Sequence, residues 1–168
     1  GLVQMPNPAS SGTGFFHVSG WIQMMGEEKA WAFMDRLHQN VASYVHSGSK
    51  PCRDAATGEF PVGIAYELLG AQLKTRGAPI ETLVMAEGGG WDMDVFAIVR
   101  GTRNLEAAKR LADWASSRKA NEMYAAFATQ VAWPGIENRM PNYPPGVAES
   151  LIRMTEEALQ QQRETNND

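Results

Sequence analysis

A short turn rich in serine and glycine, PASSGTG at Pro8–Gly14, carries residues well suited to bind an anion. A helix is predicted to follow it, and the unpaired amides and partial positive charge of a helix start attract phosphate or phosphonate groups. The glycines would let the backbone approach closely, and Ser10, Ser11 and Thr13 add hydroxyl donors. The alternative is an ordinary helix cap, in which one serine satisfies the helix end and the glycines turn the chain.

A second turn, HSGSKP at His46–Pro51, has the same character. Ser47 and Ser49 flank Gly48 and stand before a short helical stretch. Two separate serine and glycine turns favour an oxyanion site between them, although such residues are also common in turns without a ligand.

A third segment, AEGGGWD, places Glu87 close to Trp91 between two predicted strands. The carboxylate and the face of the indole ring could hold an amino group by charge. The alternative is a crossing loop with a solvated acid.

Catalytic and metal patterns are absent from the sequence. The glycine turn lacks the lysine of a Walker loop, and the three histidines do not form an HExxH pattern. No GxSxG elbow is present, and the single Cys52 excludes a multi-thiolate zinc site. We therefore expect no cofactor, no metal and no catalytic residues.

Composition excludes further classes of protein. The 168 residues carry a net charge of −4, with scattered lysines and arginines, so no basic face for nucleic acid is expected. No apolar run is long enough to span a bilayer, and no signal segment opens the chain. Because the chain starts at Gly1 and at once reads as a strand, we expect a missing N-terminal part.

Strands and helices are predicted to alternate, which is typical of an α/β fold with a mainly parallel or mixed sheet. The predicted strands cover residues 2–5, 60–65, 80–85 and 94–99. The predicted helices cover residues 15–25, 27–45, 66–75, 104–116, 119–131 and 147–163, with an irregular connection over 133–146.

The combined pattern resembles the iron(III) and 2-aminoethylphosphonate branch of periplasmic solute-binding proteins, in its C-terminal half. The segments that carry the resemblance are MPNPASSGTGFF, NVASYVHSGSKPCRDAATGEFPVGIAYE and GAPIETLVMAEGGGWDMDVFAIVRGTRNLEAAKRLADWAS. They occur in the order of that family, and the pairing of SGSKPC with GEFPVGIAYE is most similar to the aminoethylphosphonate subgroup.

The resemblance implies a class II periplasmic-binding-protein-like fold in two parts. Residues 1–85 would form the second, ligand-binding lobe. Residues 86–168 would form the hinge crossing and the C-terminal, mainly helical part of the first lobe, whose remainder is absent. Such a chain would need the missing segment, or a self-association, to cover its exposed face.

The resemblance also assigns residues to the site. It implies Ser11, Gly12 and Thr13 as anion ligands with Ser10 close by, then Ser47, Gly48 and Ser49 as a second anion-contacting turn, and Tyr66 at the cleft. Glu87 is the predicted partner of an amine, with Glu67 and Asp92 as substitutes. Iron-binding relatives carry two adjacent tyrosines where this sequence has Glu67, Leu68 and Leu69, so ferric iron is not the expected ligand.

The function implied is that of a periplasmic, non-enzymatic binding component that delivers 2-aminoethylphosphonate or a phosphate-like anion to an ABC transporter permease. It would neither bind nucleic acid nor insert into the membrane. The alternatives are a phosphate-ester or phosphonate-processing enzyme with the same anion cradle, a ferric-ion-binding transport protein, and an interaction domain without a small ligand.

Overall fold

The computed structural model describes residues 1–91, 94–127, 131–138 and 140–152. In chain order the helices and strands are β1 (Val3–Pro6), α1 (Gly12–Met25), α2 (Glu27–His38), β2 (Val41–Val45), α3 (Lys50–Ala56), β3 (Val62–Gly63), α4 (Glu67–Thr75), α5 (Leu105–Ala115), α6 (Arg118–Phe127) and α7 (Val147–Ser150).

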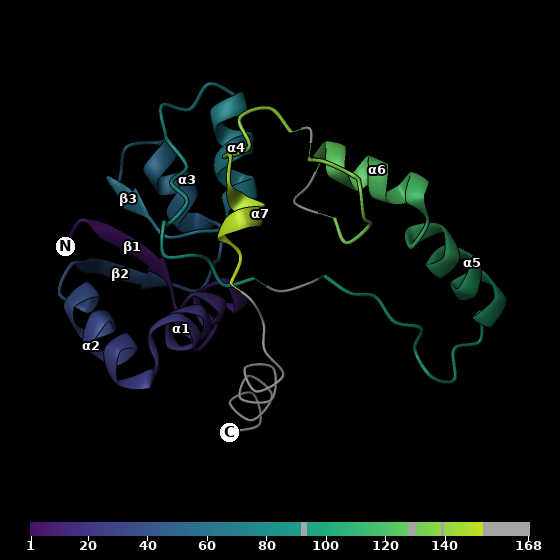
Figure 1. Cartoon of the computed structure of the whole chain (residues 1–168), viewed down its shortest axis with the longest axis horizontal. Helices are drawn as coiled ribbons and strands as arrows, with labels where there is room; N and C mark the ends of the chain where they lie inside the picture. The colour runs from purple at the N-terminus through teal and green to yellow at the C-terminus, as the bar shows by residue number, and fades with distance from the viewer. Residues whose placement is uncertain (92–93, 128–130, 139, 153–168) are drawn as a thin grey trace.

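A small parallel sheet organises the first 75 residues. β1 is its central strand, paired in parallel with β2 on one side and β3 on the other. Helices α1 and α2 lie on one face of the sheet and α3 and α4 on the other (Figure 1). The buried core lies between these layers and includes Met5, Ala30, Leu69 and Ala71. This α/β arrangement confirms the predicted fold class.

The helix predicted over residues 27–45 is wrong in its second half. The helix ends at His38, and residues 41–45 form β2. Val41 and Tyr44 happen to continue the helical spacing, but β-branched and aromatic residues favour a strand, and the segment pairs with β1. The Asn40 amide donates to the carbonyl of Arg36, which helps to end the helix.

Three predicted strands are shorter than expected or absent. The strand predicted over residues 60–65 is reduced to Val62–Gly63 at the sheet edge, where Val62 is exposed. Residues 80–85 and 94–99 are extended but pair with no strand in the described part of the chain. An apolar stretch becomes a strand only where a partner supplies its hydrogen bonds, and Leu83 and Val95 instead face solvent.

The predicted helices after β3 agree with the structure more closely. α4 follows the prediction, and Gly77, with a φ of 92°, lies just beyond its end. α5 and α6 begin close to their predicted starts. Residues 128–130, which belong to the helix predicted over 119–131, lie outside the described residues. The helix predicted over residues 147–163 is interrupted after Val147–Ser150, because Leu151 pairs with Gly89. Residues 153–163 lie outside the described residues.

The chain leaves the sheet-based unit and returns to it. Residues 94–127, with α5 and α6, stand apart from the sheet and its helices (Figure 1). The returning segment contacts α4 again, because Thr75 Oγ1 donates to the Pro141 carbonyl at 2.8 Å. Gly89 and Ser150–Ile152 then run side by side, through Gly89 N to Ser150 O at 2.8 Å and Ile152 N to Gly89 O at 3.1 Å.

Candidate functional site

Three loops meet at the carboxyl edge of the parallel sheet. The loop of residues 7–11 follows β1, residues 46–49 follow β2, and residues 64–66 follow β3. Open parallel sheets bind ligands at this edge, next to the strand where the connections change direction. Here that strand is β1, because β2 lies on one side of it and β3 on the other.

The loop after β1 is held by Asn7. Its carbonyl accepts the amides of Ser10 and Ser11 at 3.1 and 2.9 Å, and its side-chain oxygen accepts the amide of Ala9 at 2.9 Å. α1 then begins at Gly12, three residues earlier than predicted. The amides of the first helical turn consequently belong to the glycine and threonine residues of the turn, and they have no partner within the helix.

The hydroxyl of Ser11 does not cap this helix. Ser11 occupies the N-cap position, is only 8% exposed and makes no side-chain hydrogen bond to the helix end. The ordinary-cap alternative therefore does not describe its geometry. A buried hydroxyl without such a bond, next to free helix amides, is suited to donate to an anion.

The second serine and glycine turn lies directly against the first. A Cβ atom added to Gly48 would lie 2.3 Å from Thr13 Oγ1 and 3.3 Å from Ser11 Oγ. Glycine at this position is what allows the loop after β2 to reach the start of α1. The structure thus brings Gly48 to Ser11 and Thr13, although it follows them by 35 residues or more in the sequence.

The two glycines of the first turn have different surroundings. A Cβ atom on Gly14 would lie 2.5 Å from the carbonyl oxygen of Pro6, so this glycine allows α1 to pack against the end of β1. A Cβ atom on Gly12 would meet only the ring of Phe16, at 3.8 Å. The open space at the helix start is therefore at Gly12, whereas Gly14 is required by the fold.

Ser47 and Ser49 form a local turn. Ser47 Oγ accepts the amides of Ser49 at 3.3 Å and Lys50 at 3.2 Å, and the two hydroxyls lie 3.2 Å apart. Ser47 therefore supports the start of α3. Its position in the loop beside Gly48 places it at the same edge of the sheet as Ser11.

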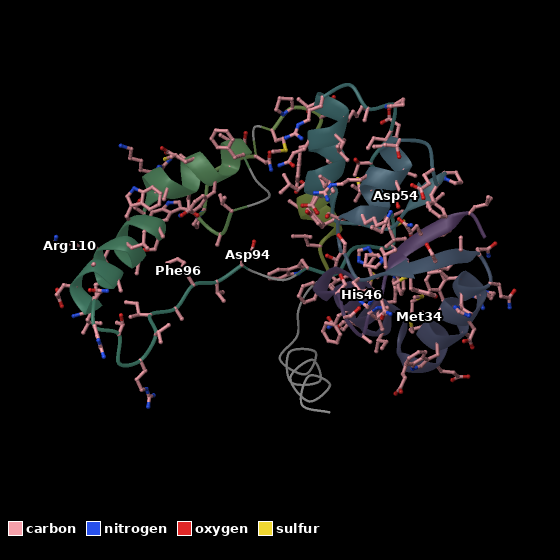
Figure 2. The ribbon with its side chains drawn as sticks, turned by 180° about the vertical axis from the view of Figure 1, so that it is seen from behind. Met34, His46, Asp54, Asp94, Phe96 and Arg110 are labelled. Carbon is pink, nitrogen blue, oxygen red and sulfur yellow. The ribbon has the colours of Figure 1, made fainter. Side chains whose placement is uncertain are left out.

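His46 joins the two turns and was missed at the sequence level. Its Nδ1 lies 2.7 Å from Ser10 Oγ, which links the loop after β1 to the loop after β2 through two side chains. In Figure 2, His46 lies beside the sheet, far from Arg110 on the projecting helices. One feature of the sequence could have identified His46 as a site residue. It stands directly before the serine and glycine turn, and in the structure it is the first residue after β2.

The lysine after the second turn is engaged elsewhere. Lys50 Nζ forms an ion pair with the carboxylate of Asp54, one turn further along α3. This hydrogen bond, with a further one from Gln4, lowers the pKa of Asp54, and the same bond raises the pKa of Lys50. The groups that the candidate site offers to an anion are therefore backbone amides and side-chain hydroxyls.

Tyr66 and Glu67 lie at the same edge, after β3. Tyr66 occupies the N-cap position of α4 and is 39% exposed. Glu67, in the first turn of α4, accepts a hydrogen bond from the Tyr143 hydroxyl at 2.7 Å. The returning segment therefore approaches the loop after β3, but no described contact joins Tyr66 to the serine turns.

Glu87 lies at the other end of α1. Its neighbour Gly88 is packed so that an added Cβ atom would lie 3.2 Å from Met24 Sδ. Met24 is twelve residues from Gly12 in α1, a distance of about 18 Å along the helix axis. The structure does not bring Glu87 to the serine turns, and Asp92 lies outside the described residues.

The other histidines have structural partners. His17 packs its ring against Trp21 with centroids 5.8 Å apart, and burial lowers its pKa. His38 Nδ1 lies 3.0 Å from the Tyr44 hydroxyl. In the ranges that the structure describes, no three His, Cys, Asp or Glu side chains are placed to hold a metal ion. None of the helices described there has the length and apolar character to cross a bilayer.

The fold is shared with solved periplasmic binding proteins. The chain is 32% identical to AfuA of Actinobacillus pleuropneumoniae, solved with exogenous fructose-6-phosphate bound, with a TM-score of 0.77 over 99% of this chain and 54% of AfuA. It is 27% identical to the periplasmic binding protein P5PA, with a TM-score of 0.78 over 98% of this chain and 54% of P5PA. The periplasmic-binding-protein-like α/β fold is thereby confirmed.

Sequence comparison adds a curated relative from Haemophilus influenzae, described as an uncharacterized protein. It is 37% identical over 123 residues, which are 73% of this chain and 36% of the relative. No protein-family profile matches the chain. The chain thus spans about a third of the length of this relative and about half the length of AfuA and P5PA.

Proposed function

We propose that this chain forms the anion-binding part of a periplasmic solute-binding protein that delivers a phosphate- or phosphonate-bearing solute to an ABC transporter permease. The observation that carries the proposal is the site at the start of α1. There the buried Ser11 hydroxyl makes no bond to the helix end, and it lies beside the free first amides of the helix and the Gly48 turn. Amides and hydroxyls arranged in this way recognise phosphate-like groups.

The likeness to AfuA supports this ligand class, because the structure of AfuA contains fructose-6-phosphate. The part of the ligand beyond its phosphate group would lie over the loop after β3, where Tyr66 and Glu67 offer polar side chains. A hydroxyl-rich sugar phosphate suits these groups. We therefore propose a phosphomonoester such as a sugar phosphate before 2-aminoethylphosphonate.

The predicted role of Glu87 in binding an amine gains no support from the geometry. The distance of about 18 Å between the two ends of α1 is far greater than the two-carbon spacer of 2-aminoethylphosphonate. An aminophosphonate held at the serine turns would need Glu67 as its acidic partner. This assignment makes 2-aminoethylphosphonate the first competitor to test.

The proposed protein binds and releases its ligand without chemical change. A hydrolase using the same site would need a general base or a metal beside the bound phosphate. His46 is the titratable side chain that the described contacts bring to the turns, and its Nδ1 is directed to Ser10. Release of inorganic phosphate from a bound ester would contradict the proposal and favour the enzyme.

The predicted division of the chain at residue 85 remains a proposal. Residues 94–127 are the part that we assign to the first lobe, because they stand apart from the sheet (Figure 1). Residues 141–152, in contrast, contact α4 and the crossing segment of residues 88–91. A ligand would be held between the carboxyl edge of the sheet, in the second lobe, and the first lobe.

Isothermal titration calorimetry tests the ligand class. Fructose 6-phosphate, 2-aminoethylphosphonate, inorganic phosphate and ferric citrate would each be titrated into this chain and into a protein extended to the length of the solved relatives. We expect saturable binding of fructose 6-phosphate and weaker binding of the other two phosphorus compounds. Preference for 2-aminoethylphosphonate would instead support the ligand that the sequence resemblance implies. Binding of ferric citrate alone would contradict a site for a phosphate-like anion.

Substitution of the hydroxyls tests the location. Ser11→Ala and Thr13→Ala each remove a donor to a charged group, and we expect each to weaken ligand affinity roughly 10- to 100-fold. Ser19→Ala is the matched control, because Ser19 lies about two turns further along α1 and its hydroxyl accepts from Gln23. Unchanged affinity in both site variants would place the anion elsewhere.

A further inference from the structure

The hydrogen bond between Ser10 and His46 connects the two turns of the proposed site. Ser10 belongs to the loop after β1 and His46 to the end of β2, 36 residues later, and both side chains are exposed at the carboxyl edge of the sheet. The distance of 2.7 Å between Ser10 Oγ and His46 Nδ1 is that of a short hydrogen bond. Ser11, the next residue, holds the buried hydroxyl of the site.

The direction of this bond decides what Ser10 offers to a ligand. A serine hydroxyl has one proton to donate and two lone pairs that accept. If the imidazole accepts at Nδ1, the serine proton is used within the protein, and an anion would face only lone pairs. If Nδ1 carries a proton and donates it to Ser10 Oγ, the serine proton is free for an anion.

We propose that His46 is a positioning residue of the anion site, which donates from Nδ1 to Ser10 Oγ and thereby directs the Ser10 hydroxyl proton to the bound phosphate group. The inference rests on the proposed function. The bond also fixes the loop after β1 to the loop after β2. The hydroxyls of Ser10 and Ser11 and the Gly48 turn are then held in place before a ligand arrives, which lowers the entropic cost of binding.

The neighbouring charges are compatible with this arrangement. The loop and first turn after β1, residues 7–16, contain no ionisable side chain, and His17 in the next turn is half-buried, which lowers its pKa. The ammonium group of Lys50 is paired with Asp54, and the carboxylate of Glu67 accepts from Tyr143. The charged groups of Lys50 and Glu67 thus have partners other than His46.

A double-mutant cycle measures the coupling between the two side chains. Fructose 6-phosphate would be titrated into the wild-type protein, Ser10→Ala, His46→Ala and the double variant. We expect each single change to weaken affinity between about threefold and tenfold, and the double variant to bind no more weakly than the poorer single variant. Multiplied losses in the double variant, or unchanged affinity in His46→Ala, would overturn the proposal.

Two further variants separate positioning from general stability. In His46→Asn the side-chain amide can donate in place of Nδ1, so most of the affinity should return, whereas a purely electrostatic or steric role would leave Asn as poor as Ala. His38→Ala is the matched control, because it removes the same kind of bond, from the end of α2 to the Tyr44 hydroxyl, without touching Ser10. Its ligand affinity should equal that of the wild type.

The same titrations distinguish this inference from the function on which it rests. If the wild-type protein binds fructose 6-phosphate and all the variants bind equally well, the role of His46 is wrong and the proposed function stands. If the wild-type protein binds none of the phosphorus compounds while its unfolding transition shows a folded protein, the proposed function fails, and the role of His46 fails with it.

Discussion

At the scale of single residues, the serines at the start of α1 differ in their partners. Ser10 is bonded to His46, whereas Ser11 is buried without a bond to the helix that it precedes. A helix start normally gains about 1 kcal/mol from a capping side chain, and this chain forgoes that stabilisation at α1. Under the proposed function, the bound anion would complete the hydrogen bonding of this hydroxyl.

The glycines of the same turn provide a contrasting pair of substitutions. Gly12→Val adds a side chain into open space, so we expect a nearly unchanged unfolding temperature and a loss of ligand affinity, because the added methyl groups crowd the free amides. Gly14→Ala forces a Cβ atom to 2.5 Å from the Pro6 carbonyl oxygen, so the fold itself should be destabilised. Thermal unfolding and calorimetry on both variants check this; full affinity in Gly12→Val would move the ligand away from the helix start.

At the scale of secondary-structure elements, α3 is tied to the central strand by a polar cluster. Asp54, with 8% exposure, accepts from Lys50 on its own helix and from Gln4 on β1. Gln4 also donates to Ser43 Oγ on β2 at 3.2 Å. The cluster fixes the helix that follows the second serine turn, so it supports the site without contacting a ligand.

This cluster predicts a pH dependence of stability. The bond from Lys50 lowers the pKa of Asp54 in the folded protein, so its contribution is complete above the ordinary aspartate pKa of about 4 and is lost as the pH falls through the lowered value. We expect Asp54→Asn to lower the unfolding temperature at pH 7. Between pH 5 and 2, the unfolding temperature of this variant should fall less than that of the wild-type protein. Asp35→Asn, an exposed change on α2, is the control, and an identical effect of the two variants would contradict the role of Asp54.

The sequence predicted elements well where local signals and packing agree. The turn chemistry located the two serine turns, and the periodic apolar residues located α4 and α5. It failed at β2, because Val41 and Tyr44 fit both a helical spacing and a strand, and only pairing with β1 decides between them. It also missed His46, since the link to Ser10 depends on two strands being neighbours in the sheet.

At the scale of the whole molecule, the projecting part of the chain exposes apolar side chains. α5 buries no residue, and the extended segment before it has Val95 and Val99 about four-fifths exposed, at 81% and 77%. Figure 2 shows Asp94, Phe96 and Arg110 on this projection, away from Asp54 and the sheet. Such a surface is normally covered by protein.

We expect residues 94–99 to become a paired strand in a protein of the length of the solved relatives. Hydrogen exchange followed by mass spectrometry would show fast exchange of these amides in the present chain and slow exchange in the longer protein. The amides of β1, already paired on both sides, serve as the internal control, because their protection should be high in both. Equally fast exchange of residues 94–99 in the longer protein would contradict this expectation.

The close contact between α1 and the glycine run at residues 88–90 gives this helix a mechanical role. A Cβ atom on Gly20 would lie 3.0 Å from Gly90 Cα. The backbone of the helix and the backbone of the crossing segment are therefore in direct contact at these two glycines. Under the proposed function, one end of α1 contacts the ligand, while its middle contacts the segment through which the chain leaves the sheet. A small tilt of α1 on ligand capture would therefore displace Gly90 as well, because no flexible side chain lies at this contact to absorb the movement.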